Sequence, residues 1–296
     1  MKILYLGVHS HKGWGSEYWL KKSFQDLNIK LELIDYRLIR KEFGLKYLKL
    51  QIESNSIDCD IIFLQRGDRL SPNLFENIHI PLIFWSTEPI QLKNDVDDLL
   101  RSKIFSWVFV HSYSCLDRIA RDFTHINNIS SVMHNAAPKE IIKIESNKKR
   151  FAIFNRNLSW RRKWWLFPSR KLYDGINGTY GDDYFKDLRE SQISINIHYS
   201  NKNIDDFESG IFEAMASGCA IISERLHNKT LIDLGIEDVI IQIDSPRELK
   251  QQLLEFKTNK KNIEKYQQKS LVAIQHNTWE NRAQLFINKF QEICHK

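Results

Sequence analysis

The sequence has no long apolar run and few cysteines. None of its hydrophobic stretches approaches the ~20 residues that a membrane-spanning helix needs, although a peripheral membrane contact stays open. Its four cysteines, Cys59, Cys115, Cys219 and Cys294, show no C-x-x-C spacing. The chain begins with the strand-like KILYLGV and without a signal-peptide pattern. These absences predict a cytoplasmic protein whose cysteines are small core hydrophobes.

The common metal and dinucleotide motifs are also missing. There is no H-E-x-x-H and no Asp-x-Asp after a strand. The acidic pairs Asp182-Asp183 and Asp205-Asp206 are adjacent residues, which rarely converge on one ion. We therefore predict no bound metal ion and no cofactor. The glycine loop at residues 9–19, HSHKGWGSEYW, is not a G-x-G-x-x-G fingerprint, so a dinucleotide is not favoured.

The composition is that of a globular protein with a basic balance. The 296 residues are 42% hydrophobic and 27% charged, which allows two domains of about 150 residues each. The net charge of +6 suits an anionic ligand, a nucleic acid or an anionic surface, but ordinary solvated faces explain it equally well. Aromatic residues make up 12%, with eight tryptophans, more than packing alone usually requires.

The first half of the chain alternates apolar runs with amphipathic segments. The expected strands are residues 2–8, 31–35, 60–65, 81–85, 106–111 and 131–133. Continuous apolar strands are typical of a parallel sheet that is buried on both faces. The alternation predicts a doubly wound, Rossmann-like α/β domain over residues 1–140.

A polar, basic segment at residues 139–150 is predicted to be a linker, after which the α/β pattern restarts. The expected strands here are residues 150–155, 175–180, 193–199, 220–223 and 239–243. Ser245, Pro246 and Glu248 have the order of a helix cap, first position and third position. We expect a second Rossmann-like domain over 150–278, a terminal helix at 279–296, and a ligand cleft between the domains.

The stretch 207–225, FESGIFEAMASGCAIISER, reads as loop, helix and strand. Ser209 and Gly210 stand at the predicted helix start, where free amides and the positive dipole end suit a phosphate. Gly218 is expected to end this helix. Glu213, predicted in the first turn, could accept two hydrogen bonds from a ribose diol. The alternative is an ordinary αβ unit of a parallel sheet.

Basic residues follow the first strand of the second half. Arg156 is joined by the run Arg161-Arg162-Lys163, and such groups could neutralise a diphosphate. Three tryptophans interleave with this run, so a nucleic-acid patch is an alternative. A solvated basic loop is the third interpretation. We favour the diphosphate for Arg156 and Arg162.

Polar residues also follow strands in the first half. The loop after the first strand contains His9, His11, Trp14 and Ser16, which could line a ligand cleft. Ser16 is predicted to cap the following helix. A loop without a ligand role is the alternative.

Three residues of the first half are candidate acids or bases. Glu88 and His9 each follow a predicted strand, and His111 stands at the end of one. Glu88 stands in the loop WSTEP, where the sequence indicates little structural reason for a carboxylate. For the two histidines, a structural hydrogen-bonding role is at least as well supported.

These motifs give the chain a resemblance to the GT-B glycosyltransferases of group 1 type, especially the CgeB and spore protein YkvP-like group. The similar blocks are KILYLG, DIIFLQRGD, PLIFWSTEP, WVFVHS, GDDYFKDLRESQISIN, IFEAMASGCAIISE, DSPRELKQQL and HNTWENRA. The resemblance implies two Rossmann-like domains around a nucleotide-sugar, the first on the acceptor side, with the terminal helix crossing back to it. It also implies retaining, metal-independent sugar transfer.

The resemblance assigns the donor phosphates and ribose to the stretch 207–225. Glu213 would hold the ribose, and Ser209, Gly210 and Ile211 match the segment whose amides bind phosphate. Arg156, with Arg162 or Lys163, matches the basic pair on the diphosphate.

Other positions follow the family less closely. Tyr180 and Gly181 fall where the chain of related proteins runs past the nucleotide base. Gly15 is counted with the donor-facing residues. Where many relatives carry a glutamate near the donor sugar this chain has Asp205, so Asp206 or Glu208 could substitute. Glu88 aligns near a loop that often supplies a catalytic-site histidine.

The expected function is therefore transfer of a sugar from a nucleotide-sugar, UDP-linked, to an acceptor. Fixed cations and helix amides would stabilise the charge that develops on the leaving phosphate. A cell-surface or spore glycan, a protein or a modified DNA base could be the acceptor. The alternative is a non-catalytic protein that binds a nucleotide-sugar or nucleic acid with a GT-B frame.

Overall fold

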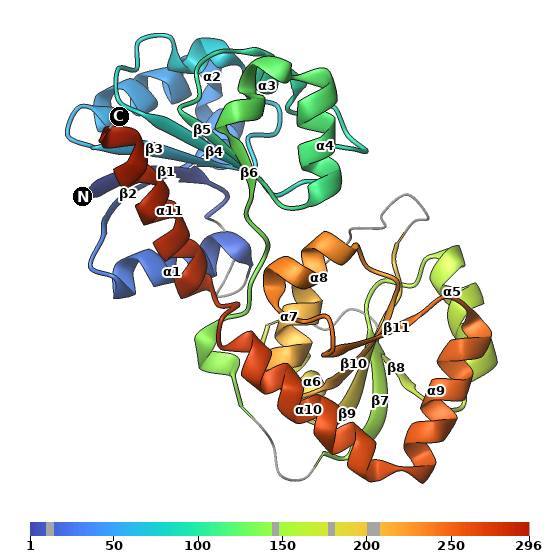
Figure 1. Ribbon diagram of the computed structural model, residues 1–296. Helices are drawn as coiled ribbons and strands as arrows, with labels where there is room; N and C mark the ends of the chain where they lie inside the picture. The colour runs from blue at the N-terminus through green and yellow to red at the C-terminus, as the bar shows by residue number, and fades with distance from the viewer. Residues whose placement is uncertain (10–14, 144–147, 177–180, 200–207, 296) are drawn as a thin grey trace. The chain divides into compact units, whose positions relative to one another are not determined.

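The computed structural model describes residues 1–9, 15–143, 148–176, 181–199 and 208–295 (Figure 1). It divides into two compact units. The first unit comprises Met1–His134 and Glu280–Lys296, and the second comprises Asn135–Trp279. Residues 139–143 of the predicted linker pack within the second unit, where the amide of Lys143 donates to the carbonyl of Ala216 at 2.9 Å.

The first unit is built on a six-stranded parallel sheet with the order β2-β1-β3-β4-β5-β6. The strands are β1 (Lys2–Gly7), β2 (Lys30–Asp35), β3 (Ile61–Gln65), β4 (Leu82–Ser86), β5 (Trp107–Val110) and β6 (Ser130–Val132). The helices are α1 (Ser16–Asp26), α2 (Tyr36–Ser56), α3 (Asp97–Arg101), α4 (Tyr113–Asp122) and α11 (Trp279–Cys294), with 3₁₀ turns η1 (Pro72–Phe75) and η2 (Thr124–Ile129).

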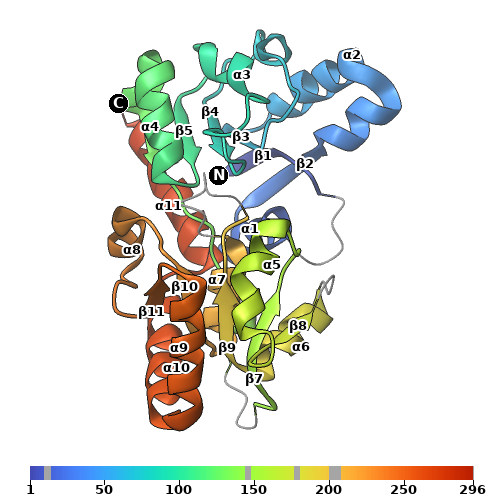
Figure 2. The same cartoon turned by 90° about the vertical axis from the view of Figure 1, so that its right-hand side faces the viewer.

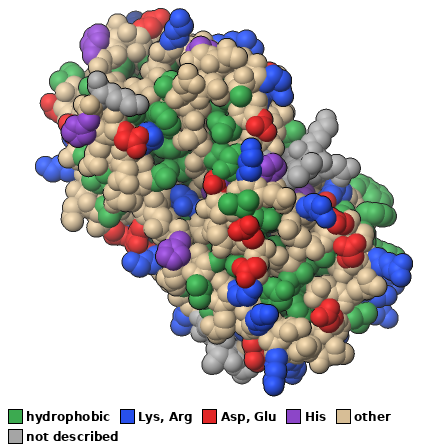
Figure 3. Space-filling model, in the orientation of Figure 1, with side chains coloured by type: hydrophobic (Ala, Val, Ile, Leu, Met, Phe, Trp, Pro, Cys, Tyr) green, Lys and Arg blue, Asp and Glu red, His purple; other side chains and the backbone are tan. Residues whose placement is uncertain are grey.

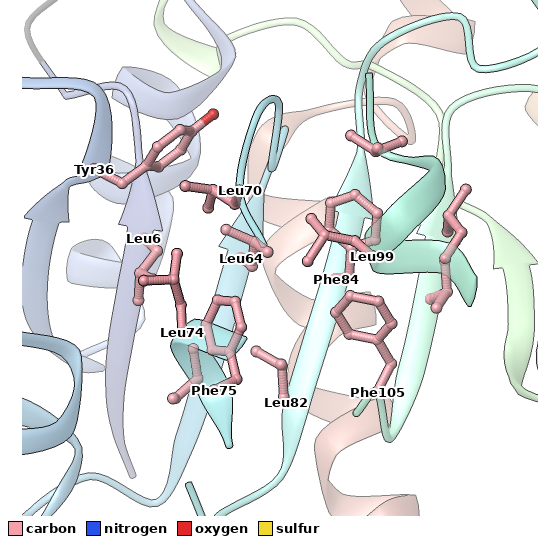
Figure 4. Close-up of a cluster of buried hydrophobic side chains, with 14 of the residues drawn as sticks. Leu6, Tyr36, Leu64, Leu70, Leu74, Phe75, Leu82, Phe84, Leu99 and Phe105 are labelled. Carbon is pink, nitrogen blue, oxygen red and sulfur yellow. The ribbon is translucent and has the colours of Figure 1, made fainter. Parts of the chain in front are cut away.

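Both faces of this sheet are covered, as its continuous apolar strands predict. On one face, strand residues such as Leu64 and Phe84 pack against α2, η1, α3 and α4 (Figure 4). On the other face, Phe286 of α11 lies with its ring centroid 4.6 Å from Phe63 and 5.4 Å from Phe24 of α1. The predicted return of the terminal helix to the first domain is therefore confirmed.

Helix α2 is interrupted at Gly44. Gly44 has φ 81° and ψ 175°, which breaks the helix into two arms. Glycine tolerates this positive φ because it lacks a Cβ. The kinked element is plain in Figure 2.

The second unit contains a five-stranded parallel sheet with the order β11-β10-β9-β7-β8. The strands are β7 (Arg150–Asn155), β8 (Asp174–Ile176), β9 (Ser191–Asn196), β10 (Ala220–Glu224) and β11 (Ile240–Ile243). The helices are α5 (Trp160–Leu166), α6 (Asp182–Arg189), α7 (Ser209–Ala216), α8 (Asn228–Leu234), α9 (Pro246–Thr258) and α10 (Lys260–Ile274), with 3₁₀ turns η3 (Lys139–Ile141) and η4 (Phe167–Ser169).

One face of this second sheet packs against α5 and α9. Trp165 and Leu166 of α5 join Leu249, Leu253 and Phe256 of α9 in a buried cluster over β7, β9 and β10. The predicted α/β class with two parallel sheets is confirmed. No helix in the described part of the chain is long and apolar enough to cross a membrane.

Helix ends are predicted with mixed success. Ser245 caps α9 by accepting from the amide of Glu248 at 3.2 Å, and Gly218 takes φ 68° just after α7, both as predicted. Ser16 is not the cap of α1: the cap is Gly15, and the Ser16 hydroxyl donates to Glu17 instead. The prediction that all cysteines are core residues is wrong for Cys294, which is exposed.

Candidate functional site

The site in the second unit begins at the switch point of its sheet. The chain leaves β7 toward β8 on one side and returns to β9 on the other side, so the strand order reverses between β7 and β9. Ligands of open α/β sheets bind outside the carboxyl ends of the strands at such a point. Arg156 directly follows β7, and α7 begins after the segment that follows β9.

Two arginines meet one carboxylate at this point. Arg156 Nη1 and Arg162 Nη2 both donate to Glu208, the latter at 2.7 Å. Arg162 is only 3% exposed, and it also donates to the carbonyl of Ile197 at 2.8 Å and to that of Asn157 at 3.0 Å. Burial alone would raise the pKa of Glu208, but the two guanidinium groups hold it below its usual value. The three side chains are therefore charged together.

Gly210 lets the guanidinium of Arg156 lie directly on the backbone of α7. A Cβ at Gly210 would stand 2.5 Å from Arg156 Nη2 and 2.7 Å from the hydroxyl of Tyr184. Glu208 is the N-cap and makes no side-chain hydrogen bond to the described part of the helix. Its pairing with arginine therefore leaves the positive end of the helix dipole without a carboxylate cap.

Glu213 lies next to this cluster, one turn further along α7 than predicted. The helix begins at Ser209, so Glu213 stands in its second turn, where its side chain is partly buried. The hydroxyl of Tyr184 on α6 hydrogen-bonds to its carboxylate. Burial raises the pKa of Glu213, although this bond and the charge of Arg156 oppose the shift.

The sequence alone assigns no role to Tyr184, although it lies in the block GDDYFKDLRESQISIN. It stands in the first turn of α6, whose N-cap Gly181 has φ 62°. The available signal is its place on the helix that follows β8, at the same edge of the sheet. Gly181 is described, whereas Tyr180, Asp205 and Asp206 lie outside the described residues.

The basic run after β7 does not act as one cluster. Arg161 forms an ion pair with Glu224 at the end of β10 and donates to the carbonyl of His198 at 2.8 Å. Lys163 points to solvent. Among the alternatives for the partner of Arg156, the geometry therefore places Arg162 and not Lys163 at Glu208.

In the first unit, Glu88 has structural partners that the sequence does not reveal. Its carboxylate accepts from Arg66 Nη1 at 3.1 Å and from Lys93 Nζ at 2.7 Å. Arg66 also forms an ion pair with the buried Glu17. Glu17 follows β1 and Arg66 follows β3, the two strands between which the order of this sheet reverses.

The other first-unit candidates lie in loops at the same edge of that sheet. Gly15 adopts φ 101° at the start of α1. A ring nitrogen of His9 hydrogen-bonds to the carbonyl of Tyr5 at 3.2 Å, and burial lowers its pKa. His111 Nδ1 lies 3.7 Å from the sulfur of Cys115. His11 and Trp14 lie outside the described residues.

No group of three or more His, Cys, Asp and Glu residues that could hold a metal ion gathers within the described ranges.

The two parallel-sheet units and the arginine–carboxylate cluster are those of an α/β protein with a ligand site at the switch point of its second sheet. Comparison with a family model identifies the family. A family model described as glycosyl transferase-like matches residues 136–288, just over half of the chain. The chain belongs to this glycosyl transferase-like family. No curated protein matches its sequence.

Solved structures agree on the fold over nearly the whole chain. HepE of Anabaena, crystallised with UDP-glucose, has a TM-score of 0.68 at 12% identity and covers 99% of this chain and 100% of its own. A glycosyltransferase from Rickettsia africae has 0.67 at 11%, covering 99% and 98%. The N-terminal domain of Candida albicans trehalose-6-phosphate phosphatase has 0.69 at 11%, covering 99% and 97%.

Such low identities show a shared fold alone, and the predicted GT-B class is confirmed. The CgeB and YkvP-like group stays a prediction.

Proposed function

We propose that the protein transfers a sugar from a UDP-linked nucleotide-sugar to an acceptor hydroxyl. The observation that carries this proposal is the pairing of Arg156 and Arg162 on Glu208 at the start of α7, with the guanidinium of Arg156 against the backbone of Gly210. Paired guanidinium groups and a helix N-terminus are both suited to a diphosphate. The UDP-glucose bound by HepE and the UDP bound by the pneumococcal O-GlcNAc transferase GtfA support the choice of donor.

In this proposal Glu213 accepts hydrogen bonds from the two ribose hydroxyls. Tyr184 orients its carboxylate by donating to it. A diol presents two donors on adjacent carbons, which a carboxylate can accept together. Ser209 and Gly210 contribute the amides of the first turn. Gly181 lies at the start of the neighbouring helix α6, beside the place where the nucleotide base would lie.

Glu208 has a different role from the sugar contact that its place in the sequence suggests. Both of its oxygens accept from arginine, so we propose that it orients the arginine pair. A diphosphate would have to share or exchange these hydrogen bonds. The sugar contact is left to Asp205 or Asp206.

The proposed reaction breaks the bond between the anomeric carbon and the β-phosphate oxygen. The electron pair passes to the phosphate, where Arg156 and Arg162 stabilise the growing negative charge. The acceptor hydroxyl attacks the anomeric carbon from the same face and gives its proton to the departing phosphate oxygen. This sequence retains the anomeric configuration and uses neither a metal ion nor a strong side-chain base.

Calorimetric titration with UDP tests the assignment of the donor site. Arg156→Ala should weaken UDP binding at least about tenfold, because it removes charge-assisted hydrogen bonds. Arg225→Ala is the matched control, since Arg225 pairs with Asp244 in the same unit but is 67% exposed. Equal affinity of the wild type and Arg156→Ala would contradict the site.

The reaction itself is tested by NMR of the product formed from UDP-glucose and a glycan acceptor. The expected product has the anomeric configuration of the donor, and an inverted product would refute the mechanism. Binding of UDP-sugars without transfer or hydrolysis would instead favour the non-catalytic alternative. Panels of cell-surface glycans, spore glycans and DNA with modified bases would identify the acceptor class.

A further inference from the structure

The donor site does not account for the outer side of α5. Trp160, Trp164 and Phe167 are 89%, 64% and 63% exposed. Their spacing of four and three residues places them on one side of the helical segment. Trp165 and Leu166, between them in sequence, are buried in the core. The three exposed rings therefore form an aromatic stripe that the fold itself does not use.

A cationic hollow lies beside the aromatic stripe, between η4 and α9. It has a volume of about 270 Å³. Its lining residues are Pro168, Arg170, Lys171, Leu172, Lys250 and Leu254. The lining thus combines three cations with three apolar residues, and none of these described residues is a carboxylate.

The stripe and the hollow are continuous. The guanidinium of Arg170, in the hollow, lies over the ring of Phe167, in the stripe, at 4.4 Å. Helix α9 borders the hollow and packs against η4. In Figure 3, hydrophobic, basic and acidic side chains adjoin one another on the flank where Figure 1 labels α5 and α9.

We propose that this surface docks the protein on an anionic phospholipid membrane. Tryptophan and phenylalanine side chains partition into the interface between headgroups and acyl chains. Lys and Arg residues near an anionic leaflet are attracted by its negative surface potential. The hollow receives a lipid phosphate between Arg170, Lys171 and Lys250, while the aromatic stripe enters the interface.

Charge and geometry favour a lipid surface over a single-stranded nucleic acid. A nucleic-acid track needs cations along a groove, with aromatic faces spaced for successive bases. Here Arg170, Lys171 and Lys250 gather in one hollow, whereas the rings of Trp160 and Trp164 stand outside it in solvent. An amphipathic surface of this kind matches the layering of a bilayer, with apolar rings deeper than the phosphate level.

Vesicle sedimentation tests the proposal directly. The wild type should bind phosphatidylcholine vesicles that contain about 30% phosphatidylglycerol, and should bind pure phosphatidylcholine vesicles much less. Trp164→Ser combined with Phe167→Ser should weaken binding about tenfold or more, because the membrane interface loses two of the aromatic rings that enter it. Arg170→Gln combined with Lys171→Gln should weaken binding to the anionic vesicles and remove most of its salt dependence.

A matched control distinguishes binding through this surface from non-specific hydrophobic adsorption to vesicles. Ile232→Ser removes a 60% exposed hydrophobic side chain from α8 of the same unit and should leave vesicle binding unchanged. Trp160 is left intact in these variants because it lies two residues from Arg162. Thermal unfolding checks that every variant is folded.

Three outcomes would overturn the proposal. The first is wild-type protein that does not sediment with the anionic vesicles, and the second is unchanged binding in the folded double variants. The third is a single-stranded oligonucleotide that binds through these residues and displaces the protein from vesicles. None of these outcomes touches the donor site, because UDP affinity is measured without lipid.

Discussion

At the scale of single residues, Gly210 determines where Arg156 can lie. The positions that a Cβ would contact are the ends of side chains, Arg156 and Tyr184, and not backbone atoms. An added methyl group can therefore be accommodated by moving the very groups that we assign to the donor site. Helix formation favours alanine at this position, whereas donor binding, as we propose it, requires glycine.

Gly210→Ala should consequently weaken UDP binding about tenfold or more, since Arg156 loses its place on the helix backbone. Its free energy of unfolding should change by less than about 1 kcal/mol, because alanine favours the helix by roughly that amount. Titration calorimetry and urea unfolding give the two values. Gly175→Ala is the control: its Cβ would meet nothing closer than 3.5 Å. Unchanged UDP affinity in Gly210→Ala would show that Arg156 does not bind the diphosphate.

Glu213 should make the fold less stable as pH rises. Because burial raises its pKa in the folded state, the folded protein holds this proton more tightly than the unfolded chain does. The cost is absent below the ordinary glutamate pKa of about 4.3 and complete above the raised value. Glu213→Gln should therefore stabilise the protein at about pH 7 and have little effect at about pH 4. Urea unfolding at both pH values measures this difference.

Glu208 provides the internal comparison with the opposite sign. Its pKa is lowered in the folded state, so its ionisation stabilises the fold above about pH 4.3, and this contribution is lost as pH falls through the lowered value. Glu208→Gln should be destabilising at about pH 7 and nearly neutral in acid. If both substitutions shifted stability in the same direction at neutral pH, the charge assignments of the cluster would be wrong.

At the scale of elements, local patterns predict the strands better than the side-chain partners. The block IFEAMASGCAIISE predicts a helix and a strand, and both form as α7 and β10. The same pattern places Glu213 one turn too early: the helix does begin at Ser209, so Glu213 is its fifth residue and stands in the second turn. The break in α2 was not predicted, since Gly44 is a single residue inside a periodic segment.

Side-chain partners in the candidate site also could not be predicted from local patterns, because they come from distant parts of the chain. Arg156 and Arg162 could be proposed because both follow a strand that ends in a loop. Their common partner Glu208 is 52 residues from Arg156, and Tyr184 comes from a third element. Contacts between such distant residues depend on the order β9-β7-β8, which periodicity alone does not reveal. The exposure of Trp160 and Trp164 beside the buried Trp165 is likewise a property of packing.

At the scale of the whole molecule, the last helix, α11, belongs to the first unit, which is otherwise formed by the N-terminal part of the chain. Phe286 of α11 is fully buried between Phe24 and Phe63, whereas the residues assigned to the donor lie within Asn135–Trp279. Each unit also has its own hydrophobic core. Stability of the first unit and donor affinity of the second should therefore be separable.

Phe286→Ala should destabilise the first unit by about 3–5 kcal/mol, because it leaves a cavity between the sheet, α1 and α11. Hydrogen exchange should then accelerate in β1, β3 and α1 while β7, β9 and β10 keep wild-type rates. UDP affinity, titrated well below the unfolding temperature, should stay within about twofold of the wild type. Leu285→Ala is the control on the same helix, since Leu285 is 41% exposed. Loss of UDP binding in folded Phe286→Ala, with Leu285→Ala unaffected, would show that the first unit takes part in holding the nucleotide.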